Sequence, residues 1–313
     1  MSYLDEIKRE ANLVENKAEH DDNSKEVDNR ILELSSKKGF HTIDMSKLPS
    51  KGRFYPSNMT ISIRSLRMEE ILYVAEVNEK NVIDVYGGFN DVLSDCCRVR
   101  YSNTAGSYKD ILKCDETVLA YYIRELTWPS ATINLTISEG TCKNGCRGDN
   151  KVDVRLSDCT IEAEELPADI MKYYNENERV FEFKFKNGES IKMKPTTIGS
   201  HAAAWNYAVQ NELQKKSYDK VAATHVPLML RWEEINDKAF FDYSSQMYGW
   251  PLDKFAAINN LAKQVDNYAM DLTIKDVTCP SCGGLVDIQT SFQDSIYTIF
   301  VPSVSSESDY GLV

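Results

Sequence analysis

The sequence predicts an α+β protein in which helices and antiparallel strands are mixed and two cysteine knuckles lie between strands. Apolar residues recur at helical spacing after Asp115 and again between residues 200 and 272, which indicates amphipathic helices. Between residues 131 and 193 they alternate with polar residues, which is the period of a half-buried strand. Each of two close cysteine pairs is flanked on both sides by strand-like stretches.

The length and composition are those of a globular protein. A chain of 313 residues suggests one large domain or two ordinary ones, and 42% hydrophobic residues can bury a substantial core. The net charge of −12 argues against a general nucleic-acid binder, because phosphate binding requires concentrated positive charge. No apolar run approaches the roughly 20 residues that span a bilayer. The first residues contain no apolar signal region, so we expect neither secretion by that route nor a membrane partner.

The first 130 residues are predicted to form a charged arm followed by a mixed segment. Residues 1–44 are an N-terminal arm and linker, interpreted either as a mobile tail or as an amphipathic arm that docks on a partner subunit. Residues 45–130 begin with an extended, proline-rich strap at residues 48–56 that is pinned onto the fold. The elements expected after it are a strand at 59–63, a helix at 68–79, a helix at 82–99 interrupted by Gly87-Gly88, and a helix with Asp115 as its N-cap that ends at Trp128-Pro129.

The remaining residues alternate between strand and helix patterns. Residues 131–198 are assigned to the first cysteine knuckle and to β-hairpins, the clearest of which has Asn187-Gly188 between alternating apolar residues. A helical insertion is expected over residues 199–272, with its last helix at 252–272. The second knuckle and a closing strand take residues 273–302, and the Ser-rich tail at 303–313 is expected to fray.

Four of the eight cysteines form the two close pairs, Cys142 with Cys146 and Cys279 with Cys282. In a reducing compartment such pairs favour metal binding over disulfides. Zinc prefers four soft ligands in a tetrahedron, which two tight turns with two thiolates each can supply. The similar segments 152–157 and 286–291 that follow the pairs support two matching half-sites. We therefore predict one shared, closed and structural zinc site with these four cysteines as ligands.

Other interpretations of the cysteines stay open from the sequence. The four thiols could be reduced and free of metal, or two separate sites could form, with Cys159 joining the first pair and no candidate near the second. A redox dithiol at Cys279 and Cys282 is disfavoured, because such pairs usually open a helix. The other cysteines are interpreted as small buried hydrophobic residues: Cys96, Cys97, Cys114 and Cys159.

Patterns that would indicate catalysis are missing from the sequence. There is no phosphate-binding glycine-rich loop with lysine and no nucleophile elbow, so we expect no enzyme, no catalytic residue and no small-molecule substrate. The alternative to a structural protein is a zinc-ribbon module that binds nucleic acid. The basic residues near the first knuckle (Lys143, Arg147, Lys151 and Arg155) are countered by Asp149, Asp153 and Asp158, which weakens that alternative.

Several segments, taken in order, resemble the baseplate hub proteins of T-even-like contractile-tailed bacteriophages over about residues 45–302. They are Leu48-Pro-Ser-Lys-Gly-Arg-Phe-Tyr-Pro56 with the strand and helix start after it, Asp110-Ile-Leu-Lys-Cys-Asp115 leading into Tyr121-Tyr-Ile-Arg-Glu-Leu-Thr127, the first knuckle with the hairpin at 181–193, and Cys279-Pro-Ser-Cys-Gly-Gly284 ahead of Phe300-Val-Pro302. Two features depart from that pattern. The first knuckle has three residues between its cysteines where the family has two, and the arm and the tail lie outside the resemblance.

The resemblance implies a non-enzymatic protein that takes part in building the tail baseplate and its central hub. Its expected partners are other baseplate and hub subunits, and nucleic acid is not expected. Such a protein is made in the host cytoplasm and lies in the virion tail baseplate if it is a permanent component. The motifs do not decide between a permanent subunit and an assembly factor.

Overall fold

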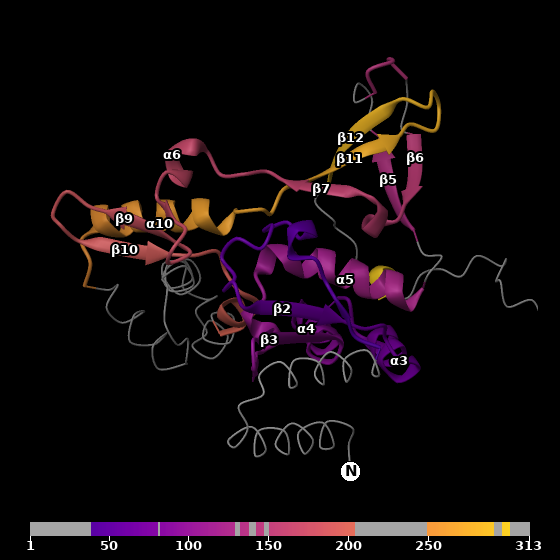
Figure 1. Ribbon diagram of the computed structural model, residues 1–313, viewed down its shortest axis with the longest axis horizontal. Helices are drawn as coiled ribbons and strands as arrows, with labels where there is room; N and C mark the ends of the chain where they lie inside the picture. The colour runs from indigo at the N-terminus through magenta and orange to yellow at the C-terminus, as the bar shows by residue number, and fades with distance from the viewer. Residues whose placement is uncertain are drawn as a thin grey trace, which may run out of the picture. The chain divides into compact units, whose positions relative to one another are not determined.

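A computed structural model describes residues 39–80, 82–128, 132–137, 142–146, 150–203, 249–290 and 296–300 (Figure 1). These residues form a mixed α+β structure in which the named strands pair antiparallel, as the sequence predicts. The amphipathic arm, most of the helical insertion and the Ser-rich tail lie outside the described residues. Among the described helices, none is long and apolar enough to cross a membrane.

The first sheet contains four strands in the order β1-β2-β3-β4. Its bounds are β1 His41–Thr42, β2 Met59–Ile63, β3 Cys97–Tyr101 and β4 Thr104–Ala105. The helices α3 (Met68–Glu76) and α4 (Val82–Cys96) connect β2 to β3. The predicted strand at 59–63 is confirmed, because its alternating apolar residues face a buried core.

The second predicted helix differs from α4 in two ways. The helix ends at Cys96 and not at Val99, because Cys97, Val99 and their neighbours pair with β2 and continue the sheet. The helix also runs through Gly87-Gly88 without interruption. Gly88 permits close packing there, since a Cβ at this position would lie 2.8 Å from Ile296 and 2.9 Å from Val77. The first helix likewise ends early, at Glu76, with Val77 as its C-cap.

Helix α5 (Lys113–Thr127) is the central helix and packs against β2. It ends at Trp128 as predicted, but its N-cap is Leu112, so the prediction that Asp115 caps the helix is wrong. Asp115 lies inside the first turn, fully buried, and its carboxylate binds groups from another part of the chain.

The strap at residues 48–56 is pinned to α5 by the Asp115 carboxylate. The Ser50 amide donates to it at 2.8 Å, the Ser50 hydroxyl at 2.6 Å and the Tyr55 hydroxyl at 2.7 Å. The Tyr55 oxygen in turn accepts from the Leu112 amide at 2.8 Å. The strap is therefore attached as predicted, but it is a series of turns and not an extended segment, with Lys51 and Gly52 at positive φ. Burial raises the pKa of the Asp115 carboxyl, and the three donors oppose that shift.

Aromatic packing joins the strap to a second sheet of three strands in the order β10-β9-β8. The Phe54 ring lies 4.9 Å from Tyr174, 5.3 Å from Phe181 and 5.0 Å from Tyr268. The predicted hairpin around Asn187-Gly188 is confirmed, with Met193 opposite Phe181. The strand bounds are β8 Tyr174–Asn175, β9 Val180–Lys184 and β10 Ser190–Met193.

Helix α10 (Leu252–Asp266) packs its buried residues into the same core but ends before the predicted Leu272. The chain leaves the helix at Asn267 and turns through Ala269 at a φ of 56°, so that Leu272 can begin a strand. Tyr268, in this turn, donates to the Ser50 carbonyl at 3.3 Å. The strap thus contacts α5, the second sheet and the end of α10.

Two further hairpins lie side by side in Figure 1. One is formed by β5 (Ile133–Ile137) and β6 (Asn150–Val154), and the other by β11 (Leu272–Thr278) and β12 (Leu285–Thr290). Strand β7 (Thr160–Ala163) pairs with β11. Leu156, expected to continue a strand, lies in a 3-10 turn, because the buried Glu125 carboxylate of α5 accepts the amides of Leu156 and Ser157. The remaining short helices are η1 Met45–Lys47, η2 Tyr108–Asp110, α6 Ala168–Met171 and α11 Ile296–Phe300.

The buried hydroxyl of Tyr55 gives a test of the strap. The substitution Tyr55→Phe removes a donor to Asp115 and leaves the Leu112 amide without its acceptor. We expect the free energy of unfolding, measured by urea denaturation, to fall by about 1–3 kcal/mol. The matched control is Tyr73→Phe, which removes an exposed hydroxyl bonded to Asp91 and should change stability by less than about 0.5 kcal/mol. Equal losses for the two variants would contradict the role given to the strap.

Candidate metal centre

The two hairpins each carry one cysteine pair in the connection between their strands. Cys142 and Cys146 lie between β5 and β6, and Cys279 and Cys282 lie between β11 and β12. We call residues 142–146 the first knuckle and residues 279–284 the second knuckle. Strand β12 packs against β5, so the two knuckles lie at neighbouring hairpin ends. Buried residues on both hairpins hold this contact: Ile133, Leu135, Ile137, Val286 and Ile288.

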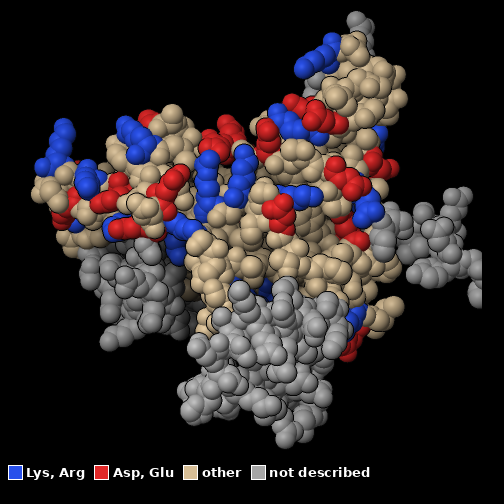
Figure 2. All heavy atoms as spheres, in the orientation of Figure 1, with Lys and Arg blue, Asp and Glu red and all other residues tan. Residues whose placement is uncertain are grey.

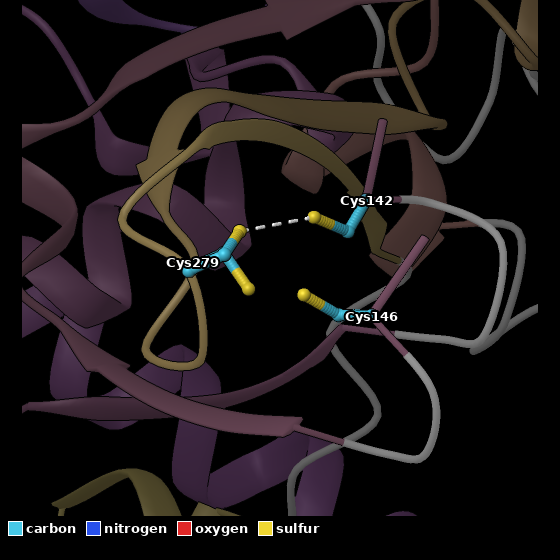
Figure 3. Close-up of side chains that lie close together, drawn as sticks. Cys142, Cys146 and Cys279 are labelled. Atoms are coloured by element: carbon cyan, nitrogen blue, oxygen red, sulfur yellow. Dashed lines mark hydrogen bonds between the residues drawn. The ribbon is translucent and has the colours of Figure 1, made fainter. Parts of the chain in front are cut away.

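The four sulfur atoms converge on one point. All of them lie within 4.8 Å of one another, and the sulfurs of Cys142 and Cys282 are 3.5 Å apart. A zinc ion bound by four thiolates at about 2.3 Å places its sulfur atoms about 3.8 Å apart. Figure 3 shows Cys142 and Cys146 pointing from one side toward Cys279 on the other. The spacing of the cluster therefore fits a tetrahedral metal site.

Tight turns present the thiols of each knuckle. In the first knuckle the Gly145 amide donates to the Cys142 carbonyl at 2.9 Å. In the second knuckle the Gly283 amide donates to the Cys279 carbonyl at 2.8 Å, and the Cys279 amide donates to the Gly284 carbonyl at 2.8 Å. Gly145 and Gly283 adopt φ values of 69° and 71°, a region that is costly for residues with a Cβ. Glycine at these two positions allows the chain to curl around the sulfurs.

The exposed thiol of Cys282 receives hydrogen bonds from both knuckles. The Asn144 side-chain amide donates to its sulfur at 3.3 Å, and the Gly284 backbone amide donates at 3.4 Å. These donors lower the pKa of Cys282 to about 6, which favours the thiolate that a metal requires. Sulfur contacts with Cys282 and Cys142 raise the pKa of Cys146 to about 12. Because a metal binds thiolates, metal binding at these cysteines would release protons.

Gly284 lets the two knuckles approach closely. A Cβ at this position would lie 2.9 Å from the Asn144 amide nitrogen and 3.4 Å from the Cys282 sulfur. Asn144 and Gly284 thus support the site without being ligands. The sequence pattern predicts that Gly284 lets the backbone curl and bring its amides to the thiolates. It does not predict the role of Asn144, which depends on contact between knuckles far apart in the chain and is signalled only by its position beside the cysteines.

The residues present fit zinc in a structural role. All four ligands come from the protein, which leaves no open position for a substrate or a water molecule. Cys142 and Cys279 are buried, Cys146 is half-buried and only Cys282 is exposed. The arrangement matches the predicted single shared site. Cys159 is outside the cluster, and its thiol instead donates to the Arg155 carbonyl at 3.3 Å.

The other predictions about cysteines are also confirmed in most respects. Strands flank the second knuckle on both sides, and the helix that would open a redox motif is not there. Cys96, Cys97 and Cys114 are buried, and burial raises the pKa of Cys96 to about 12. Cys159 is only half-buried. These four thiols are therefore poor nucleophiles with ordinary packing roles.

The surface around the knuckles carries both signs of charge. Lys275 on β11 forms ion pairs with Asp287 at 3.0 Å and Glu162 at 3.4 Å, which neutralise it. Figure 2 shows basic and acidic side chains interspersed over the described part of the face in view. The acidic residues Glu162, Glu164 and Glu165 are exposed, as expected for a solvated face. In the described residues, the concentrated positive charge that nucleic-acid binding requires is not seen at the knuckles.

The chain was also compared with known proteins. No family model, no curated protein and no solved structure matches it. The close approach of the four cysteine sulfurs is the observation that indicates a metal centre.

Loss of one ligand should release the metal. We expect Cys279→Ser to reduce bound zinc, measured by atomic emission on purified protein, from about one ion per chain to near zero. The melting temperature should fall by on the order of 10 °C, because zinc-binding free energy is also folding free energy. Cys159→Ser is the matched control and should retain zinc. An unchanged zinc content and melting temperature in Cys279→Ser would refute the assignment.

The supporting amide can be tested separately from the ligands. Asn144→Ala removes the side-chain donor to Cys282 and leaves all four thiols in place. We expect the zinc affinity, measured by competition with a chromogenic chelator, to fall about tenfold. Lys143→Ala, at the exposed neighbouring position on the same turn, should leave the affinity unchanged. Equal affinities for the two variants would show that Asn144 has no part in the site.

Proposed function

We propose that this protein is a non-catalytic structural or assembly protein of a phage tail baseplate and its central hub, held in shape by a structural zinc ion. The observation that carries the metal part of the proposal is the convergence of four thiols from two hairpins. Cys142 and Cys282, whose sulfurs are 3.5 Å apart, are separated by 140 residues of sequence. The baseplate part is supported by the ordered sequence motifs over about residues 45–302.

The zinc ion would act as a cross-link between distant segments of the chain. Binding of zinc to such a site contributes on the order of 10 kcal/mol to folding, because the preformed site does not exist in the unfolded chain. Isolated two-stranded hairpins are marginally stable, so a cross-link between the ends of these two hairpins would add to their stability. A metal at their ends therefore accounts for why four cysteines are kept together here.

The motifs that resemble the baseplate hub family also contact one another in the fold. Ser50 and Tyr55 of the first motif bind Asp115 of the second, and Phe54 packs on Phe181 of the predicted hairpin. The two knuckles meet at the metal centre. A fold shared with that family would require contacts between these motifs, which lie far apart in the sequence. The observed contacts therefore support the resemblance of all the motifs together more than any single motif does.

Exposed apolar side chains on α3 support a protein that binds partner subunits. Met68, Leu72 and Tyr73 have 66%, 58% and 48% of their surface exposed. Met68 and Leu72 are four positions apart, so they lie on one face of the helix. Apolar surface of this kind on a soluble protein is typical of protein interfaces. The partners we propose are other baseplate and hub subunits, met in the host cytoplasm.

Deletion of the gene in its phage tests the proposal. We expect tail formation to stop, as seen by electron microscopy of lysates. Complementation with Cys159→Ser should restore tails, whereas Cys279→Ser should restore them poorly at raised growth temperature. Quantitative mass spectrometry of purified particles then separates a subunit, present at a fixed ratio to tail proteins, from an assembly factor that is absent. Normal tails without the protein would refute the baseplate proposal.

A further inference from the structure

A cleft of about 920 Å³ lies beside the strap. Its described lining residues include none from the two cysteine knuckles. Tyr101 of β3 and four segments line it: the end of the strap and the residues after it at 54–59, the η2 region at 107–112, the turn before β9 at 177–179, and the segment at 194–203 that follows β10. The volume is in the range of pockets that hold a small ligand or several residues of a peptide.

Two cationic side chains, Lys109 and Arg179, line the cleft, and neither forms an ion pair within the described part of the chain. The lining also contains two acidic residues. Asp110 accepts the Ser107 amide at 2.9 Å and keeps its charge, and Glu178 forms an ion pair with Lys192. Lys194 adds a third cation to the lining.

The backbone fixes the points at which the side chains of Lys109 and Arg179 leave the chain. Arg179 has a φ of 56°, unusual for a residue with a side chain, and its amide donates to the Asn175 carbonyl at 2.7 Å. Lys109 lies in η2, against the start of the helical segment at Gly199. A Cβ at Gly199 would lie 2.9 Å from the Lys109 Cβ and 3.0 Å from its carbonyl oxygen. The Phe54–Tyr55 wall is anchored by the aromatic cluster and by Asp115.

We propose that this cleft binds an acidic peptide segment of a partner protein, with Lys109 and Arg179 pairing with its carboxylates. An arginine can bind a carboxylate with two parallel hydrogen bonds, and the polar backbone of the lining can bind a peptide main chain. The chain has a net charge of −12, which repels other negatively charged molecules. This repulsion is stronger for a nucleic-acid duplex than for a short acidic peptide, because the duplex carries one negative charge per roughly 1.7 Å of its length. This inference rests on the proposed function and specifies one of its partner surfaces.

The test uses the full chain and a short fluorescein-labelled peptide of alternating glutamate and serine. We expect fluorescence anisotropy to show binding that weakens as salt is raised, and the double variant Lys109→Glu/Arg179→Glu to bind at least about tenfold more weakly. The matched control is Lys80→Glu/Lys186→Glu, which changes the net charge equally at exposed positions outside the cleft. It should retain at least half of the wild-type affinity, and circular dichroism should show both variants folded.

Three results would overturn the inference. The first is equal loss of binding in both double variants, which would make the effect one of net charge. The second is a wild-type dissociation constant above about 1 mM. The third is tighter binding of an oligothymidylate that also depends on Lys109 and Arg179, which would assign the cleft to nucleic acid. If the peptide fails to bind while tail formation still requires the protein, the cleft proposal falls and the proposed function stands.

Discussion

The buried carboxylate of Asp115 is the interaction on which the central part of the fold depends. A carboxylate removed from water is costly unless hydrogen bonds replace its solvation, and here two side chains and a backbone amide of the strap do so. The strap is thereby held on α5, and it carries Phe54 into the aromatic cluster of the second sheet. The strap thus connects α5 and the second sheet within one hydrophobic core.

The four cysteines likewise join segments that are distant in the sequence, here the two hairpins. Their strands pack through buried apolar side chains, and the four thiols at the hairpin ends lie within 4.8 Å of one another. Asn144 and Gly284 show that the contact is specific, since one donates to a ligand of the opposite knuckle and the other leaves room for it. The buried carboxylate at the strap and the cluster of thiols at the knuckles thus add specific polar contacts to one continuous hydrophobic core.

Sequence patterns predicted the elements whose shape is decided locally. The strand at 59–63 and the hairpin around Asn187-Gly188 follow from alternation and turn residues that act within a few positions. Element ends were predicted less well, because distant partners decide them: pairing with β2 converts the end of α4 into strand, and Ser50 takes the carboxylate of Asp115 that was expected to cap α5. The four cysteines were identifiable by type and spacing, whereas Asn144 acts on a sulfur 138 positions away.

The separation of the two knuckles in the chain has a consequence for biosynthesis. During synthesis the chain leaves the ribosome with its N-terminal residues first. The first knuckle emerges early and holds only half of a coordination shell until residues 279–284 have been translated. Prematurely terminated chains that end before this point cannot complete the site, so they lack its stabilisation and are more readily degraded by proteases. The metal centre would therefore act as a check that translation has reached the second knuckle.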